Sequence, residues 1–288
     1  MSNVKHLASA PEMSTIDSVE RHHNIPNPDR LSIIAAIILL AYVSTIFINL
    51  PGRTLGVQLP SIYLAVEINV RTVIALLVAG LTATGADWLL RDHPALQGKH
   101  TFRHWLLPAL TAWVIGVPLY LLPFGTQWLV ALTLGGALLM LVLVAEYIAV
   151  DPEDIRYAIA SAGLTAVSFA IFLILALALR SAGLRLFLTL PALTFASFLV
   201  VLRALHLRLG GVWAIMPSLA LALIIAQLSA ALHYLPLLPT TYGLALIGPT
   251  YALTTLVANL AEGIPLQRAI AGPALVLIIV WGAALWTI

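Results

Sequence analysis

Long apolar stretches separated by short polar breaks make up most of this chain. Each stretch has about the length of helix, roughly 20 residues, that the hydrocarbon core of a bilayer requires. The pattern therefore predicts nine transmembrane helices. The nine stretches are residues 31–50, 69–90, 102–122, 125–150, 155–179, 184–207, 212–235, 240–260 and 266–286.

The start of the second stretch is ambiguous in the sequence. Residues 62–70 are apolar apart from Glu67 and Asn69. This segment could lie along the membrane surface or form the first turns of a long, tilted helix.

The first 30 residues differ from the rest of the chain. They mix Ser, Asn, Pro and His with charges of both signs, and no helical apolar period persists in them. This composition is typical of a disordered tail. The expected organisation is a tail at 1–30 followed by a single transmembrane helical domain at 31–288. The first apolar stretch follows the tail and is too long for the apolar region of a secretory signal, so we expect it to remain as a span.

Composition supports this all-α, polytopic membrane class. Apolar residues make up 61% of the 288 residues and charged residues only 9%, which a soluble fold of this size could not solvate. The resemblance is to bacterial multi-pass membrane proteins, and it is one of composition without motifs. It implies the bacterial plasma membrane as the location.

The positions of Lys and Arg predict the orientation of the nine spans. Ten of these residues fall in the N-terminal tail and the connections on its side, and four fall on the other side. Because cytoplasmic loops carry the excess of Lys and Arg, we expect the N-terminus in the cytoplasm and the C-terminus outside. The ten are Lys5, Arg21, Arg30, Arg91, Lys99, Arg103, Arg156, Arg203, Arg208 and Arg268, and the four are Arg53, Arg71, Arg180 and Arg185.

Several kinds of chemistry have no support in the sequence. The chain has no cysteine, which removes disulfides, zinc thiolates, iron–sulfur clusters and covalent haem. His100 and His104 are four residues apart, but no third ligand is fixed by the sequence, so no metal site is predicted. We predict no cofactor and no catalytic constellation, and the few dispersed basic residues do not form a nucleic-acid surface.

Two acidic residues lie about one helical turn inside their spans. Charged groups at this depth are costly and tend to face a cavity or a partner, so Asp87 and Glu146 are candidates for a proton or cation site. The alternative is that Asp87 pairs with Arg91, Glu146 reaches the membrane surface, and both serve only to fasten helices. Arg203 and His206, one turn apart, could bind an anionic group, or could anchor their helix at the interface.

Two Gly-Pro pairs give the best mechanistic hint. Gly248-Pro249 and Gly272-Pro273 lie within the eighth and ninth spans, where proline removes a backbone hydrogen bond and can open the helix. Interrupted neighbouring helices form the midplane sites of many secondary transporters, and Asn259 could add a polar group there. Proline kinks also occur in spans with no such role.

Three functional classes remain open. The kinked spans and intramembrane acids favour a small-solute or proton-coupled transporter. Small-residue surfaces such as Gly135-Gly136 in the fourth span favour a membrane scaffold or an accessory subunit. Arg203, His206 and Glu146 near one leaflet would suit an enzyme that acts on a lipid, if they converge in a cleft. The expected partners are membrane lipids and either a second protein or further copies of the chain, with no nucleic acid.

Overall fold

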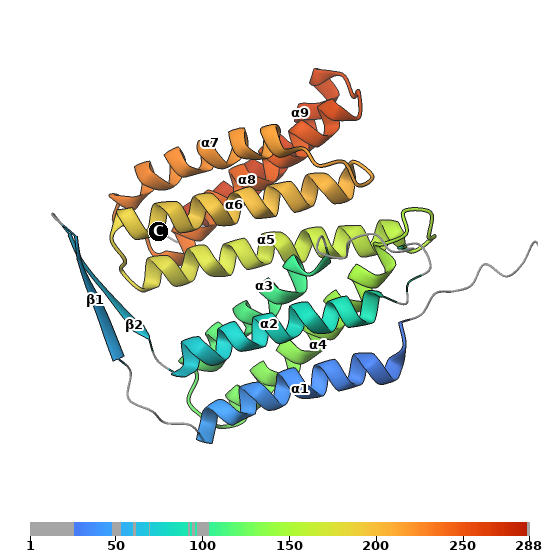
Figure 1. The fold of residues 1–288 in the computed structure, drawn as a ribbon. Helices are drawn as coiled ribbons and strands as arrows, with labels where there is room; N and C mark the ends of the chain where they lie inside the picture. Colours follow the sequence, from blue (N-terminus) through green and yellow to red (C-terminus); the bar gives the residue numbers. More distant parts are fainter. Residues whose placement is uncertain are drawn as a thin grey trace, which may run out of the picture.

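Nine helices and one β-hairpin account for the elements of the described chain (Figure 1). The computed structural model describes residues 26–47, 53–59, 62–68, 70–91, 93, 96 and 104–286. The helices are α1 (Pro28–Phe47), α2 (Val70–Leu90), α3 (Leu106–Leu121), α4 (Thr126–Ile148), α5 (Tyr157–Ser181), α6 (Leu186–Arg208), α7 (Ile215–His233), α8 (Pro239–Ala261) and α9 (Leu266–Trp286). The strands are β1 (Arg53–Leu59) and β2 (Ile62–Ile68).

The prediction of an all-α multi-pass bundle is confirmed. Within the described residues, eight helices are long and apolar enough to cross a membrane. The remaining helix, α3, has 16 residues and at 1.5 Å per residue spans about 24 Å, somewhat less than a typical hydrocarbon core. The orientation of the bundle stays a prediction, and residues 1–25 of the expected tail lie outside the described residues.

Local sequence explains where the first helix begins. The side chain of Asn27 accepts a hydrogen bond from the backbone N–H of Asp29 at 2.9 Å, as N-cap residues do. Pro28 then opens the helix, where its missing N–H costs nothing. As a result α1 begins inside the segment that we expected to be a tail.

The helices alternate in direction and form two neighbouring groups. In Figure 1, α1–α4 occupy the lower part of the view and α5–α9 the upper part. Each group has its own hydrophobic core: residues such as Ile38 and Leu139 pack in the first, and Phe172 and Leu246 in the second. A third cluster, formed by residues of α3, α4, α5 and α6 and the turn after α4, joins the groups. The candidate site described below lies beside this junction.

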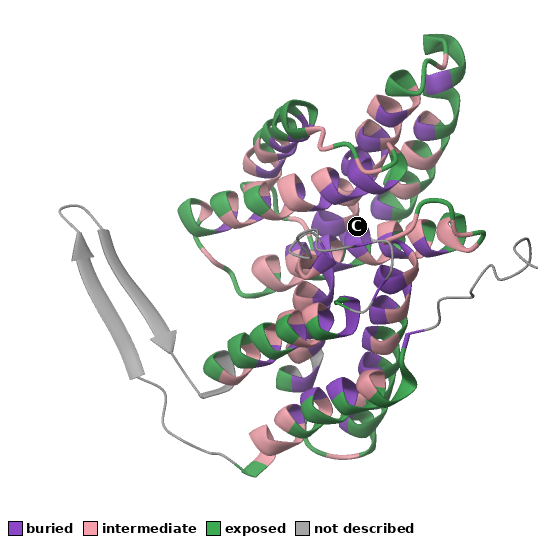
Figure 2. Cartoon of the chain, turned by 45° about the vertical axis from the view of Figure 1, so that its right-hand side comes forward, coloured by how far each residue is buried: buried purple, intermediate pink, exposed green. Residues whose placement is uncertain are grey.

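Much of the outer surface is apolar. Figure 2 shows exposed residues along the outward faces of the helices, and large aliphatic residues such as Leu40, Leu134 and Leu285 are about two-thirds exposed. Soluble monomers rarely show so extensive an apolar surface. The arrangement fits a protein whose outer surface contacts lipid.

The Gly135-Gly136 pair of α4 packs inside the bundle. A Cβ atom at Gly135 would lie 2.5 Å from a side-chain carbon of Ile115 in α3, and one at Gly136 would lie 2.9 Å from Leu39 in α1. The pair therefore serves close packing within the chain. It is not the surface for a partner helix that the sequence suggested.

Residues 62–68 do not form the first turns of a helix, which was one of the two possibilities considered from sequence. They are the second strand of an antiparallel hairpin, in which Arg53 pairs with Ile68 and Leu59 with Ile62. Helix α2 begins at Val70, two residues after the strand ends. The strict alternation of aliphatic residues explains the strand, because successive side chains of a strand point to opposite faces.

Candidate functional site

Charged and polar side chains gather at the end of the bundle where α4, α6 and α8 finish and where α3 and α5 begin. We call this the Glu146 end. Tyr157, at the start of α5, donates a hydrogen bond of 2.7 Å to the carbonyl oxygen of Leu207 in α6. Arg208, at the end of α6, forms an ion pair of 2.7 Å with Glu262 directly after α8. These contacts place the ends of helices distant in sequence at one level.

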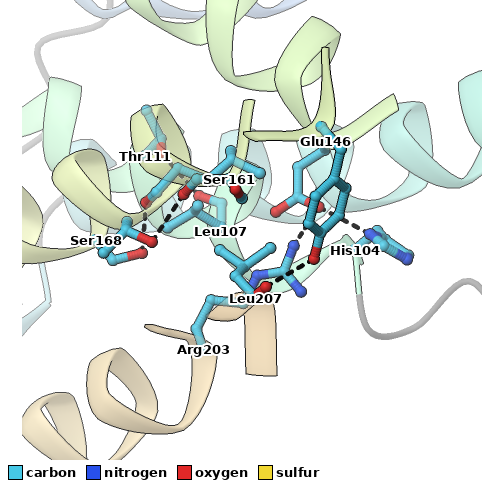
Figure 3. A network of polar contacts seen from close by, with 11 residues as sticks. His104, Leu107, Thr111, Glu146, Ser161, Ser168, Arg203 and Leu207 are labelled. Atoms are coloured by element: carbon cyan, nitrogen blue, oxygen red, sulfur yellow. Dashed lines mark hydrogen bonds and ion pairs between the residues drawn. The ribbon is translucent and has the colours of Figure 1, made fainter. Parts of the chain in front are cut away.

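A carboxylate shared by two bases forms the centre of this region (Figure 3). Oε2 of Glu146, in the last turn of α4, lies 2.8 Å from Nδ1 of His104. The same oxygen accepts a hydrogen bond from Nη2 of Arg203 in α6. His104 lies just before α3, so the three side chains join three parts of the chain. We call these three residues the Glu146 triad.

The triad is buried. The exposed fractions are 1% for Glu146, 3% for Arg203 and 9% for His104. A carboxylate at such a position is costly to desolvate, and its pairing with a guanidinium offsets the cost. The side chain of Glu146 is therefore enclosed by the protein and does not reach the outer surface of the bundle.

The triad leaves hydrogen-bonding capacity unused. Among the described residues, Oε1 of Glu146 and both Nε and Nη1 of Arg203 are buried without a hydrogen-bond partner. Buried polar atoms are almost always paired, and an exception calls for an explanation such as bound water or a ligand. Arg203 also lines a cavity of about 10 Å³ between α3, α5 and α6, which has room for about one water molecule.

His206 lies one turn from Arg203 but serves a different contact. Its ring stacks on that of Trp213, with 4.1 Å between the ring centroids. His206 is 7% exposed. The prediction that Arg203 and His206 together bind an anion stays untested, and the structure assigns their side chains to different neighbours.

Asp87 lies apart from the triad. It pairs with Arg91 of the same helical face at 2.6 Å, and the Arg91 side chain is 71% exposed. The hydroxyl of Thr84, which shares this face, bonds the carbonyl oxygens of Gly80 and Leu81 in its own helix. This is the local ion pair that we considered as the alternative to a proton or cation site at Asp87.

The Gly-Pro pairs do not interrupt their helices. Helix α8 continues through Pro249 and α9 through Pro273. The two prolines, considered from sequence as possible breaks, thus lie in continuous helices, and the reason lies in the contacts between α8 and α9. Proline deprives the carbonyl oxygen four residues earlier of its helical donor, and here each of these oxygens receives a donor from the other helix.

These two replacement hydrogen bonds are reciprocal. For Pro249 the deprived oxygen belongs to Ala245, and Nε1 of Trp281 in α9 donates to it at 3.3 Å. For Pro273 it belongs to Ala269, and Nδ2 of Asn259 in α8 donates to it at 2.9 Å. The carbonyls that could have formed a midplane ligand site are thus occupied by side chains of the chain itself.

Gly248 and Asn259 have structural partners in this interface. A Cβ atom at Gly248 would lie 3.2 Å from Val280 and 3.3 Å from Leu277 and Trp281, so the glycine permits α9 to approach. At Gly272 a Cβ atom would meet nothing within 4 Å. Besides donating to Ala269, Asn259 accepts a hydrogen bond of 2.5 Å from Arg208.

A groove opens along α5 near the Glu146 end. Its volume is about 450 Å³, and it runs between α5, α6 and α8, within the range typical of ligand sites. Small residues of α5, among them Ala162 and Thr165, form one wall, while Arg208 and Tyr251 contribute from α6 and α8. The triad is not part of its lining.

Sequence reasoning missed two residues of these sites. His104 entered only as a weak metal candidate, and Trp281 did not enter at all. Among the described residues there is no group of three or more His, Cys, Asp or Glu that could hold a metal ion. A search for i, i+4 spacing could not have found the contact of His104 with Glu146 or that of Trp281 with Ala245, because these residues are 42 and 36 positions apart in the chain.

Fold and site together define a multi-pass helical membrane protein with a buried ionic triad at one end of its bundle. A family model matches residues 50–287, from just before β1 to the end of α9. The chain belongs to this family, whose description is "Protein of unknown function (DUF5656)". No curated protein matches the chain, and no solved structure matches it.

Proposed function

We propose that this protein is a proton-coupled, transporter-like membrane protein for small solutes, in which Glu146 and His104 take up and release the proton. The observation that carries the proposal is the sharing of one buried carboxylate oxygen by His104 and Arg203. Ionisable residues inside a transmembrane bundle commonly mark ion or proton pathways.

The positions of the two groups suit a stepwise transfer of a proton. His104 lies before α3, and its side chain is 11% exposed against 1% for Glu146. Histidine side chains commonly act as proton shuttles in proteins. A proton that arrives from the aqueous phase would therefore reach His104 first and Glu146 second.

The charge of the triad would follow this proton. With His104 neutral, the negative charge of Glu146 balances the positive charge of Arg203. With His104 protonated, the triad carries one net positive charge in a region from which water is largely excluded, where charge interactions are strong. The unpaired atoms of Glu146 and Arg203 are the polar positions at which a water molecule would respond to that change.

The proposed orientation follows the distribution of Lys and Arg. It places the Glu146 end in the cytoplasm and the end of α9 outside. A reporter fused after Ile288 tests it, since a cytoplasmic signal from that fusion would contradict the proposed orientation.

Solute-driven proton currents in proteoliposomes test the transport proposal. A panel of amino acids, sugars, organic acids and inorganic cations is applied to wild-type protein and to Glu146→Gln. We expect at least one solute class to drive a current that Glu146→Gln abolishes and that the matched control Asp87→Asn retains. A wild-type protein that gives no current with any class, or a Glu146→Gln variant that retains the current, would contradict the proposal.

A second candidate function rests on the groove. Ala158, Ala162 and Ala166 form an exposed row of small residues on α5, and two of them line the groove. Small residues let helices approach closely, so this row favours an accessory subunit whose partner helix packs there. Native mass spectrometry from gently extracted membrane distinguishes the two, since a second protein at a fixed ratio supports the subunit and its absence argues against it.

The lipid-enzyme class gains less support. Of the three residues that this class requires to converge, Glu146 and Arg203 meet, whereas the ring of His206 stacks on Trp213. However, the cavity that Arg203 lines has a volume of only about 10 Å³, far below the roughly 300 Å³ of a small ligand pocket. A lipid headgroup would not fit beside the buried triad in this arrangement.

A further inference from the structure

The groove along α5 extends from the Glu146 end toward the middle of the bundle. Arg208, which lines it, is the last residue of α6. Tyr251 also lines it and lies ten residues before the end of α8, which is about 15 Å deeper at 1.5 Å per residue. The three helices around the groove all qualify as membrane spans. One end of the groove therefore lies at the level of lipid headgroups and the other within the hydrocarbon layer.

The walls of the groove change in character along this depth. Arg208 and Ser161 supply polar groups near the end of the bundle, whereas Ala166, Phe169 and Tyr251 line the deeper part. The rings of Phe169 and Tyr251 meet edge to face, with 5.4 Å between their centroids. A polar upper part above a mostly apolar lower part matches the order of groups in a phospholipid.

The width of the groove favours a hydrocarbon chain over a helix as its occupant. A volume of about 450 Å³ spread over about 15 Å of depth gives a mean cross-section of about 30 Å². A helix with its side chains is roughly 10 Å across and has a cross-section of about 80 Å². A partner helix would therefore rest on the rim of the groove, whereas an extended acyl chain can enter it.

A cation and an anion lie side by side at the headgroup level. Nε and Nη2 of Arg208 donate hydrogen bonds of 2.7 and 3.2 Å to the two carboxylate oxygens of Glu262, and Nη2 also donates to Asn259. No described residue accepts a hydrogen bond from Nη1 of Arg208. The side chains of Arg208 and Glu262 are 37% and 35% exposed, and a carboxylate has about four acceptor positions. The pair thus retains both donors and acceptors for a ligand.

We propose that the groove binds a phospholipid whose zwitterionic headgroup carries a primary ammonium, as phosphatidylethanolamine does. The phosphate accepts hydrogen bonds from Nη1 of Arg208, and the ammonium donates to Glu262. An acyl chain follows Ala166 and Phe169 into the bundle. Phosphatidylcholine has no N–H to donate to Glu262, and phosphatidylglycerol has no cation to offset its charge. This inference does not depend on the proposed transport function, and it assigns the groove to a lipid in place of the partner helix of the second candidate function.

Native mass spectrometry of the full chain tests the proposal. The protein is reconstituted in nanodiscs with equal amounts of phosphatidylethanolamine, phosphatidylcholine and phosphatidylglycerol, and the lipids that it retains on release are identified. Ala162→Trp fills the groove, since Ala162 lines it, and Glu262→Gln removes the carboxylate charge at constant size. The matched control is Arg268→Gln, because Arg268 is an exposed arginine near the start of α9, at the same end of the bundle but outside the groove. The melting temperature of each variant confirms that it is folded.

We expect the wild-type protein and Arg268→Gln to retain phosphatidylethanolamine severalfold over the other two lipids. Ala162→Trp should lose the retained lipid, and Glu262→Gln should hold phosphatidylethanolamine and phosphatidylcholine equally. Equal retention of all three lipids by the wild type, or an unchanged preference in Glu262→Gln, would overturn the proposal whether or not Ala162→Trp folds. A second protein that accompanies the chain at a fixed ratio from its own membrane, and is lost from Ala162→Trp, would also overturn it, since it indicates a partner helix at the groove.

Discussion

The Glu146 triad and the α8–α9 interface both place polar groups within an apolar bundle, yet they treat those groups differently. At the interface, each carbonyl oxygen deprived by proline receives a donor, from Trp281 in one case and from Asn259 in the other. In the triad, one oxygen of Glu146 and two nitrogens of Arg203 are left without a partner among the described residues.

This difference distinguishes polar groups that only hold helices together from polar groups that are candidates for a function. Polar groups within a membrane must be satisfied, and neighbouring helices can supply the partners. Where the chain supplies them all, as between α8 and α9, the polar groups fasten helices together. Where it leaves capacity unused, as at Glu146, polar atoms remain available to a water molecule, and it is there that we propose proton transfer.

Removing one partner of the triad has the largest expected effect. Arg203→Met leaves the carboxylate of Glu146 buried without its guanidinium, and breaking a buried ion pair in this way costs about 3–5 kcal/mol. Unfolding monitored by tryptophan fluorescence measures the loss. The double variant Glu146→Gln/Arg203→Met, which removes both charges, should regain most of the stability. If the single variant is as stable as wild type, the triad is not a buried ion pair.

Crowding the α8–α9 interface has the next largest effect. Gly248→Val places side-chain atoms against Val280, Leu277 and Trp281, and overpacking of this kind costs about 1–3 kcal/mol. The matched control is Gly272→Val, where a Cβ meets nothing within 4 Å. The same unfolding assay should show a clear loss for the first and little change for the second. Equal losses of stability in the two variants would mean that the change in helix propensity, and not packing against α9, determines the effect of the substitution.

The replacement hydrogen bonds can be isolated by a double-mutant cycle. Trp281→Phe keeps an aromatic ring but removes the donor to Ala245, at a cost of about 0.6–1 kcal/mol for a hydrogen bond in a membrane protein. In a Pro249→Ala background the new N–H at position 249 can bond Ala245 within the helix, so Trp281→Phe should cost almost nothing there. A coupling energy of zero would show that Trp281 does not replace the lost donor.

The smallest effect is expected at Asp87. Its partner Arg91 lies on the same helical face and is largely exposed, and such i, i+4 pairs contribute about 0.2–0.5 kcal/mol. Asp87→Asn should therefore change the unfolding midpoint only slightly. A loss comparable to that of Arg203→Met would show that Asp87, like Glu146, has a role within the bundle.

The spans could be predicted from sequence because hydrophobicity alone determines them. Every predicted stretch overlaps the helix that the structure contains, with ends displaced by a few residues. The hairpin was missed although its alternation is visible in the sequence. A search for apolar windows measures the average hydrophobicity of a segment. In residues 53–68 the strand is indicated instead by the alternation of aliphatic residues with other residues, which such an average does not detect.

The partners of the candidate residues were harder to predict. Sequence spacing suggested the contact of Asp87 with Arg91, since both lie on one helix. It could not suggest that Glu146 meets Arg203, because that contact depends on how α4 and α6 pack. For the same reason the sequence indicated that proline would free carbonyl groups in α8 and α9, but not that each helix would supply the donor for the other.

The reciprocal hydrogen bonds of α8 and α9 also bear on how the chain enters the membrane during synthesis. Either helix alone would present to lipid a carbonyl group without a donor, an arrangement that costs several kcal/mol. Only the turn between Ala261 and Leu266 separates the two helices. We therefore expect α8 to remain beside the insertion machinery until α9 has emerged from the ribosome, so that the two helices partition into the bilayer as a pair.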